Sequence, residues 1–289
     1  MRPGVGRATT RPRERARGRG DPAAMAMSPA WSIVSAALAL ALLPIFLARP
    51  AAAQGLAERV RGGEGEVAFR YATRPDVEVC EDGFRVGDSE THFGRWRDGW
   101  ERRCLEGPAE VVLSVEGGEV RRVELGPPGL RAADVDLGAF PPEEAAAYLL
   151  SLAEGASRRV ARDALAPAAI ADAETWPRML EIGRDRAMDR EVRESALFWV
   201  SREAAEVVTR GLSEVALDER DDEEVRKAAV FSISRREADE AVPLLMDIAR
   251  EAPGRGVRES ALFWLARIED PRVIPFFEQI LLGARGGGR

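Results

Sequence analysis

The sequence predicts an α+β protein in which a small β-rich N-terminal domain precedes an all-α solenoid. Apolar and polar residues alternate between about residues 54 and 137, which is typical of half-buried strands. From residue 141 onward the apolar period becomes that of helices. The octet VRESALFW also occurs twice, beginning at Val192 and at Val257, which indicates a repeated structural unit.

These patterns divide the chain into five segments, with boundaries where composition or period changes. The segments are an N-terminal extension with a signal peptide (1–53), a β-rich domain (54–140), a connecting helix (141–155), four helical repeats (156–282) and a disordered tail (283–289).

The N-terminal extension has the three parts of an export signal. An arginine-rich opening precedes an apolar run from about Ile33 to Leu47, and small residues then lead to a predicted cleavage between Ala53 and Gln54. The run is shorter than the roughly 20 apolar residues of a membrane span, and Pro44 interrupts it. We therefore expect an exported protein, periplasmic or secreted, with no stable membrane span after cleavage. An uncleaved N-terminal membrane anchor is the alternative.

Removal of residues 1–53 makes the chain strongly acidic. The whole chain has 42 basic and 49 acidic residues, and its first 53 residues hold eight arginines and two acids. The remainder has 34 basic and 47 acidic residues, which gives a net charge of −13. Because phosphate backbones and anionic lipid surfaces repel such a chain, we expect no nucleic-acid partner.

Two cysteines, Cys80 and Cys104, lie in the part expected to be exported, where disulfides form. A bridge between them would close a loop of about 25 residues and stabilise the fold by about 3 kcal/mol. Two free thiols are the alternative. Two cysteines and one histidine, His92, are too few for the four ligands of a structural zinc site, so we expect no metal and no cofactor.

Strand patterns are clearest in two stretches of the β-rich domain. EVAFRYA places Val67, Phe69 and Tyr71 on one face of a strand. In AEVVLSVEGGEVRRVEL, Gly117 and Gly118 separate two β-branched runs, as in a two-residue hairpin turn.

The stretch HFGRWRDGWERR has two interpretations. His92, Trp96 and Trp100 stand among arginines and could form a small-ligand or catalytic site. Alternatively, the stretch is a loop held by the predicted bridge, with its tryptophans covering a small β core. His92 has no nucleophile motif beside it and the sequence has no P-loop motif, so we expect no enzymatic activity.

The helical repeat has a period of 32 or 33 residues. One register mark is the valine at residues 160, 192, 225 and 257, and the other is formed by Pro177, Arg210, Pro243 and Pro275. Each unit is predicted as two helices. The first begins near the valine, with Asp189 and Asp222 as N-caps in two copies, and the second begins near the proline. Stacked neighbours bury the apolar faces that no single unit could bury alone.

These units resemble HEAT and HEAT-like repeats of the phycobilin-lyase type, in their short bacterial form. The resemblance rests on an aspartate, two further residues, Val-Arg and small or apolar residues, as in DREVRESALFW and DEEVRKAAVFS. GRGVRESALFW lacks the aspartate, and the copy at Val160 lacks the arginine. The resemblance covers residues 156–282 and implies a right-handed solenoid that offers an extended surface to a protein partner. Deoxyhypusine hydroxylases share such repeats, but their iron-binding His-Glu pairs do not occur in this sequence.

The aromatic residues of the octet lie on two faces of its predicted helix. Trp264 shares a face with Val257 and Ala261, so we expect Trp264, and Trp199 of the second unit, to pack in the core or between repeats. The phenylalanines lie on another face and recur in register at Phe198, Phe231 and Phe263. They form either a docking strip for a protein or a row that neighbouring helices or the β-rich domain cover.

The arginines that follow the register valines are Arg193, Arg226 and Arg258. We expect them to form ion pairs with acids of adjacent units. Together these features predict a non-catalytic exported scaffold that binds a protein partner through a HEAT-like solenoid. The alternative is a small-ligand or unrecognised enzymatic site around His92, Trp96 and Trp100.

Overall fold

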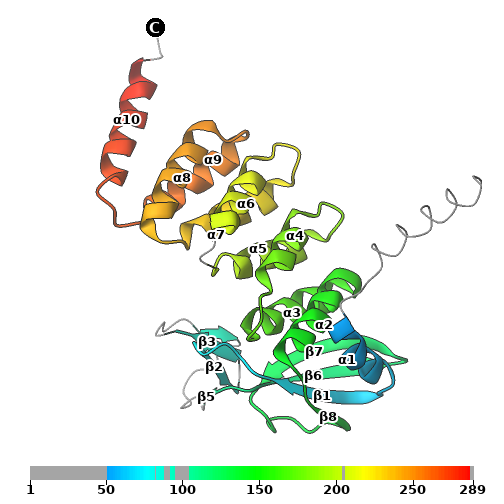
Figure 1. The fold of residues 1–289 in the computed structure, drawn as a ribbon. Helices are drawn as coiled ribbons and strands as arrows, with labels where there is room; N and C mark the ends of the chain where they lie inside the picture. Colours follow the sequence, from blue (N-terminus) through cyan, green and yellow to red (C-terminus); the bar gives the residue numbers. More distant parts are fainter. Residues whose placement is uncertain (1–50, 82, 88–91, 95–103, 204–205, 287–289) are drawn as a thin grey trace, which may run out of the picture. The chain divides into compact units, whose positions relative to one another are not determined.

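The computed structural model describes residues 51–81, 83–87, 92–94, 104–203 and 206–286. After a first helix, α1 (Ala51–Arg61), strands fill the chain up to residue 139, and helices follow from residue 142 onward (Figure 1). The predicted α+β class is therefore confirmed.

The larger sheet has four strands. They are β1 (Gly65–Tyr71), β6 (Ala109–Glu116), β7 (Glu119–Gly126) and β8 (Val135–Ala139), in the order β7-β6-β1-β8. β1 pairs antiparallel with β6 and parallel with β8. Gly117 and Gly118, with φ of 60° and 75°, form the predicted hairpin turn between β6 and β7.

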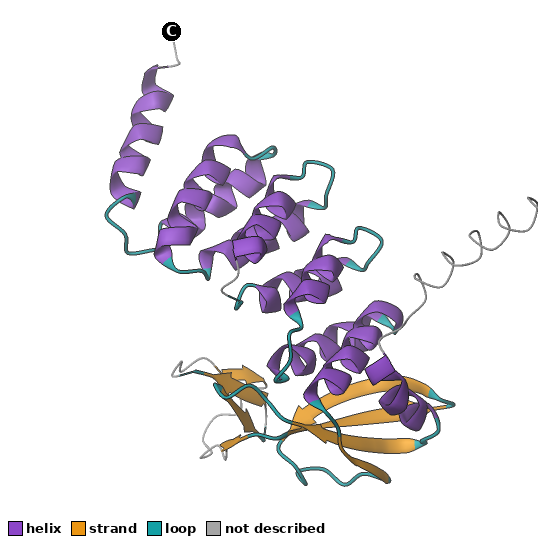
Figure 2. Ribbon diagram, in the orientation of Figure 1, coloured by secondary structure: helices purple, strands orange, loops and turns teal. Residues whose placement is uncertain are grey.

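Helices α1 and α2 (Pro142–Gly155) cover one face of this sheet (Figure 2). Val67, Phe69 and Tyr71 are 0%, 0% and 1% exposed, as their alternation predicts. The ring of Phe69 meets the ring of Tyr148, on α2, edge-on at 6.2 Å. Helix α2, which was expected to connect two domains, therefore also closes the core of the β-rich part.

Helix α1 corrects the prediction that strands begin at about residue 54. Leu56 and Val60 lie one turn apart, are 0% and 1% exposed, and join the core. The backbone N–H of Leu56 donates to a carboxylate oxygen of Glu144 on α2 at 2.8 Å. Two apolar side chains among small and polar residues give a weak helical signal, which explains why the sequence pattern missed this helix.

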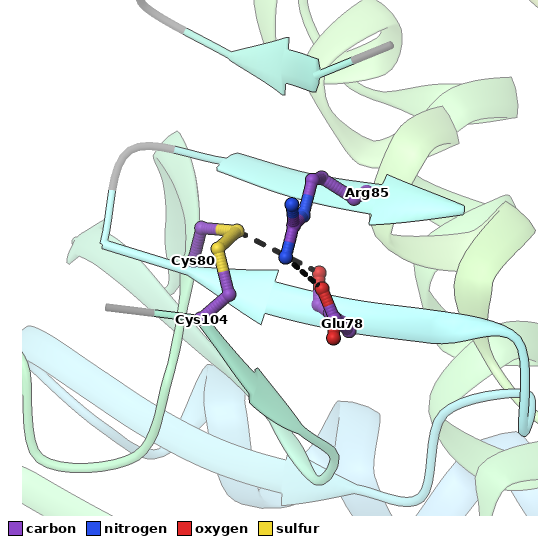
Figure 3. The surroundings of a disulfide bond; sticks show 4 residues. All are labelled: Glu78, Cys80, Arg85 and Cys104. Carbon is purple, nitrogen blue, oxygen red and sulfur yellow. Dashed lines mark hydrogen bonds and ion pairs between the residues drawn. A yellow bond between two sulfur atoms is a disulfide. The ribbon is translucent and has the colours of Figure 1, made fainter. Parts of the chain in front are cut away.

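A second, smaller sheet has the order β4-β3-β2-β5. Its strands are β2 (Val77–Cys80), β3 (Gly83–Val86), β4 (His92–Gly94) and β5 (Cys104–Glu106). Cys80 and Cys104 are paired across β2 and β5 and form the predicted disulfide. Glu78 and Arg85 form an ion pair beside the bridge (Figure 3). The disulfide thus joins the edge strand β5 to the middle of this sheet.

Eight helices follow α2, and each predicted unit contains two of them in succession. The first helices are α3 (Arg158–Ile170), α5 (Arg190–Val200), α7 (Glu223–Ser234) and α9 (Arg255–Leu265). The second helices are α4 (Trp176–Arg184), α6 (Glu206–Leu217), α8 (Ala238–Glu251) and α10 (Val273–Gly286). The closest antiparallel neighbours, however, are α2 and α3, α4 and α5, α6 and α7, and α8 and α9, so the second helix of one unit packs on the first helix of the next. Asp189 and Asp222 are the N-caps of α5 and α7, since each carboxylate accepts from the backbone N–H two residues later.

The second register mark does not coincide with every helix start. Pro177 lies in the first turn of α4, but Pro243 lies inside α8, which begins at Ala238. The prediction that the second helix begins near the proline is therefore wrong for α8. Pro243 is exposed, so its ring does not disturb the helix packing. Helix α10 continues to Gly286, past the boundary expected at Leu282.

The β-rich part and the first two repeats are in direct contact. Thr73 forms an isolated bridge with Ala171, and the Tyr71 hydroxyl donates to the carbonyl of Pro167 at 2.8 Å. Burial raises the pKa of Tyr71 far above its usual range, so this hydroxyl remains a donor. The ring of Phe84, on β3, lies 5.5 Å from the ring of Trp199 on α5.

Candidate protein-binding surface

The first helices of the repeats stack on one another, α3 on α5, α5 on α7 and α7 on α9 (Figure 1). The second helices contact each other less closely. Equivalent residues of successive first helices therefore lie side by side. A side chain repeated in register on these helices forms a continuous strip across the units.

Aromatic side chains form such a strip across three units. We call Phe198, Phe231, Trp264 and Phe263 the aromatic row. The rings of Phe198 and Phe231 are nearly parallel, with centroids 6.0 Å apart. Phe231 lies 4.8 Å from Trp264, and Trp264 lies 5.1 Å from Phe263. Ring contacts thus connect α5, α7 and α9 without interruption.

Exposure increases along this strip towards α9. Trp199, which contacts both Phe84 and Phe198, is 8% exposed, in line with its predicted place in the core. Phe198 and Phe231 are half-buried, whereas Phe263 is 48% exposed. Trp264 was expected in the core or between repeats. It is half-buried between the rings of Phe231 and Phe263.

Ser232 takes the place of the tryptophan in the third unit. It is 0% exposed, and its hydroxyl has no hydrogen-bond partner in the described part of the chain. We expect Ser232→Ala to raise the free energy of unfolding by about 1 kcal/mol, because a buried unsatisfied hydroxyl is removed. Urea unfolding measures the change. In the control, Ser234→Ala, a hydroxyl that donates to the carbonyl of Phe231 at 2.6 Å is lost, so stability should not rise. A lower midpoint for Ser232→Ala would contradict this expectation.

The three register arginines hold adjacent units together in different ways. Arg193 is buried, donates to the carbonyl of Gly183 at 3.0 Å, and forms an ion pair with Asp221 of the next unit. Arg226 donates to the carbonyls of Ala216, at 3.1 Å, and of Pro253 in the next unit. Arg258 donates to the carbonyl of Ala252 at 2.8 Å. Within the described residues, Arg193 is thus the only one of the three that forms an ion pair with an acid of an adjacent unit. Arg226 and Arg258 bond to backbone carbonyls instead.

Acidic side chains gather near the N-terminal ends of α5 and α7. Burial raises the pKa of Glu194, Arg190 opposes this shift, and the charges of Glu224, Asp222 and Glu191 add to it. Acids at these ends also interact favourably with the helix dipoles. In each of these two helices the acids precede the phenylalanine of the aromatic row along the chain.

The structure offers less support for a site in the β-rich part. Trp96 and Trp100 lie outside the described residues, and His92 is placed only by its backbone, which pairs with Arg85. No group of three or more His, Cys, Asp or Glu side chains within the described ranges could hold a metal ion. A small hollow of about 10 Å³ lies at the junction with the repeats, and Arg74, Trp199 and Arg202 are among its lining residues.

The predicted cleavage point lies at the start of the described residues. Ala53 and Gln54 lie in the first turns of α1, and the residues before 51 lie outside the described range. Among the described helices, none combines the length and the apolar character needed to cross a membrane.

Comparison with known proteins finds a similarity in the C-terminal part of the chain. The family model of HEAT repeats matches residues 209–286, which run from α6 to the end of α10. Neither a curated protein nor a solved structure matches the chain. The matched range contains Phe231, Phe263 and Trp264, and the succession of helices extends back through α3.

Proposed function

We propose that this chain, whose helical part is built of HEAT-like repeats, is a non-catalytic exported scaffold that binds a protein partner on the first helices of its solenoid. The observation that carries the proposal is the aromatic row. Rings from three successive units are in contact with one another, and the last of them, Phe263, is half in solvent. HEAT repeats generally serve as protein-interaction scaffolds.

A binding role explains the direction in which exposure changes along the row. A ring that served only to hold the repeats together would be buried, as Trp199 is at 8% exposure. Phe263 is 48% exposed although it adjoins Trp264 and Phe231. Aromatic side chains clustered at a partly exposed surface are the residues on which protein interfaces concentrate their binding energy.

Export is the second part of the proposal. It rests on the N-terminal pattern of arginines, apolar run and small residues. The disulfide between Cys80 and Cys104 supports it, because such bridges persist in oxidising compartments. We place the protein in the periplasm or outside the cell, with Gln54 as its first residue after cleavage.

Crosslinking in the native envelope, followed by identification of the captured protein, tests the function. The variant Phe198→Ala/Phe231→Ala/Phe263→Ala should reduce recovery of the partner at least tenfold, since it removes the apolar surface across all three units. The matched control is Val207→Ala/Leu217→Ala/Ile274→Ala, which truncates side chains that are 44%, 41% and 70% exposed but lie outside the row. The control should retain the partner.

Two further measurements keep this test decisive. Because Phe198 and Phe231 are half-buried, the triple variant should lose some stability, so Phe263→Ser is examined alongside it. Circular dichroism verifies that each variant is folded before capture. A partner recovered equally well with the row variants and with the wild-type chain would overturn the proposed binding surface.

A further inference from the structure

In three units of the solenoid, the second helix is covered by the first helix of the next unit. The close pairs are α4 with α5, α6 with α7 and α8 with α9. Gly183 on α4 shows how tight this contact is, since a methyl group at its α-carbon would lie 2.6 Å from the Leu197 side chain on α5. Among the described residues no helix follows α10, so the equivalent face of α10 carries no first helix there.

The register of the repeat identifies the side chains of that face. The positions five and six residues after the second register mark are buried in the three earlier units, where they hold Ile182 and Gly183, Val215 and Ala216, and Ile248 and Ala249. In α10 the same positions hold Ile280, which is half-buried, and Leu281, which is 64% exposed. Helix α10 therefore exposes apolar side chains where the earlier second helices bury theirs.

The next residue, Leu282, shows that this difference is specific to one face. Leu282 is 66% exposed, but its position is also exposed in the three earlier units, at Arg184, Leu217 and Arg250. The exposure of Leu282 thus follows the repeat, whereas the exposure of Leu281 departs from it.

Phe263 on α9 departs from the repeat in the same way. The earlier phenylalanines of the aromatic row each contact a ring of the next unit, Phe198 with Phe231 at 6.0 Å and Phe231 with Trp264 at 4.8 Å. The described ring that Phe263 contacts is Trp264 of its own helix, and Phe263 is 48% exposed. A ring from a further first helix would continue the series and cover Phe263.

The register arginine of the last unit fits the same arrangement. Arg193 pairs with Asp221, two residues before α7, and Arg226 donates to the carbonyl of Pro253, two residues before α9. Arg258 donates to the carbonyl of Ala252 at 2.8 Å, in the loop before its own helix. Because a guanidinium has five N–H donors, this bond leaves others that can reach an acceptor placed before a further helix.

Helix α10 is held mainly by its first turns. Phe276 is 3% exposed, and the guanidinium carbon of Arg250 on α8 lies 4.7 Å from the centroid of its ring. Arg272, just before α10, donates to the carbonyl of Ala238 at 3.2 Å. Helices α9 and α10 contact each other less closely than α7 and α8 do. A helix that packed on both α9 and α10 would cover the later turns of α10 as well as Phe263.

We propose that the partner docks one amphipathic helix on α9 and α10, in the place that a further first helix would take. Its apolar face packs on Ile280 and Leu281, an aromatic residue contacts Phe263, and an acidic residue just before the helix pairs with Arg258. Amphipathic helices are a common ligand of apolar grooves between helices. This inference rests on the proposed function and specifies which element the partner contributes.

Leu281 also specifies the helix that fits. It is larger than the residues at its position in the earlier units, so the docked helix needs a small residue where α5 has Leu197. A second copy of the chain is a poorer occupant, because its first helices are packed on their own neighbours and α9 has Leu262 at the position of Leu197. The partner helix therefore comes from a different protein.

Fluorescence anisotropy with the full chain tests this assignment. The probe is a labelled peptide with the sequence of residues 219–236, which contains Asp221, α7 and Phe231, with Val230→Ala as the small residue. A lactam between Glu223 and Lys227, which form an i,i+4 ion pair in the chain, keeps the peptide helical. The same peptide with Val230→Leu should bind about fivefold more weakly to the wild-type chain. The chain variant Leu281→Ala should remove this preference, an effect that a folding defect would not produce.

Matched substitutions in the chain locate the contact. Leu281→Asp should weaken binding of the probe at least tenfold, whereas Leu282→Asp, which places the same charge on the adjacent exposed residue, should leave it unchanged. Arg258→Gln should weaken binding about fivefold, and the loss should disappear with a probe that carries Asp221→Asn, as a double-mutant cycle requires. Leu281→Asp should also reduce recovery of the crosslinked partner from the native envelope.

Three results would overturn the inference. They are no binding of the probe to the wild-type chain, an equal loss for Leu281→Asp and Leu282→Asp, and a dimer in analytical ultracentrifugation that Leu281→Asp dissociates, which would assign this surface to a second copy. If crosslinking captured a protein that the phenylalanine substitutions release and Leu281→Asp does not, the scaffold function would stand and only this docking assignment would fall.

Discussion

Arg193→Met should lower the free energy of unfolding of the solenoid by about 3–5 kcal/mol, the usual cost of removing one member of a buried ion pair. The side chains of Arg193 and Asp221 are 3% and 5% exposed. Arg193 donates to one Asp221 oxygen at 2.7 Å and to the Gly183 carbonyl at 3.0 Å. Methionine keeps the apolar stem of the side chain but leaves the Asp221 carboxylate buried and unpaired.

Two controls separate burial from charge. Arg190→Met removes an arginine of the same helix that is 53% exposed and paired with Glu194 at 3.6 Å, and should cost less than 1 kcal/mol. Arg193→Met/Asp221→Asn removes the orphaned charge and should recover at least 1 kcal/mol relative to the single variant. Urea unfolding measures all three. A loss for Arg193→Met no larger than that for Arg190→Met would contradict the assignment of a buried pair.

The same pair makes stability depend on pH. Burial by itself would raise the pKa of Asp221, but hydrogen bonds from Arg193 and from the Asp222 backbone, together with the charge of Arg193, lower it below its ordinary value of 3.8. A carboxyl whose folded pKa is depressed stabilises the fold above the unfolded pKa and loses that contribution as pH falls through the folded value. Asp221→Asn should therefore lose less stability than the wild-type chain between pH 7 and pH 3.

Arg226, the equivalent of Arg193 in the third unit, has no such acid as its partner. The position equivalent to Asp221 is Pro253, and Arg226 bonds to its carbonyl oxygen. Substitution of Arg226 would leave two backbone carbonyls, rather than a buried carboxylate, without their hydrogen-bond donor. It should therefore lower the free energy of unfolding less than substitution of Arg193 does. The arginine pattern in the sequence predicts contacts between units, but the chemistry of each contact depends on which residue the neighbouring loop supplies.

Features that arise from local geometry could be predicted from the sequence. The Gly117-Gly118 turn, the caps Asp189 and Asp222, and the inward face of β1 each depend on residues close together in the chain. The repeat was detectable because several of its copies preserve the same short stretch. Such signals survive in a single sequence because the tertiary structure does not override them.

Features that depend on distant segments could not be predicted in this way. Strand β8 pairs in parallel with β1, whose sequence lies far from it, and VDLGA alone gives little strand signal. Trp199 and Trp264 occupy the same position of the repeat, yet only Trp199 contacts Phe84 of the β-rich part. The difference in exposure between these two tryptophans therefore comes from a tertiary contact, and the helical pattern treats them alike.

Removal of the disulfide has the second large expected effect. Cys80→Ala/Cys104→Ala should lower the free energy of unfolding of the β-rich part by about 3 kcal/mol, since the bridge closes a loop of roughly 25 residues and restricts the unfolded chain. The loss should centre on the small sheet, where Cys80 is 0% exposed and pairs with Cys104 across β2 and β5 (Figure 3). Ser114→Ala, on β6 of the larger sheet, serves as a substitution without loop closure and should cost about 1 kcal/mol.

Hydrogen exchange gives the local readout of the same variant. The amides of Val79 and Phe84, which pair across β2 and β3, should exchange faster without the bridge, whereas those of α7 and α9 should not change. Reduction of the wild-type chain should reproduce the double-alanine result, which separates the effect of the bond from that of the side chains. Unchanged exchange at Val79 and Phe84 after reduction would mean that strand pairing alone holds this sheet. In either case we expect the aromatic row to remain intact in a reducing compartment, because the ring contacts between α5, α7 and α9 do not involve the disulfide.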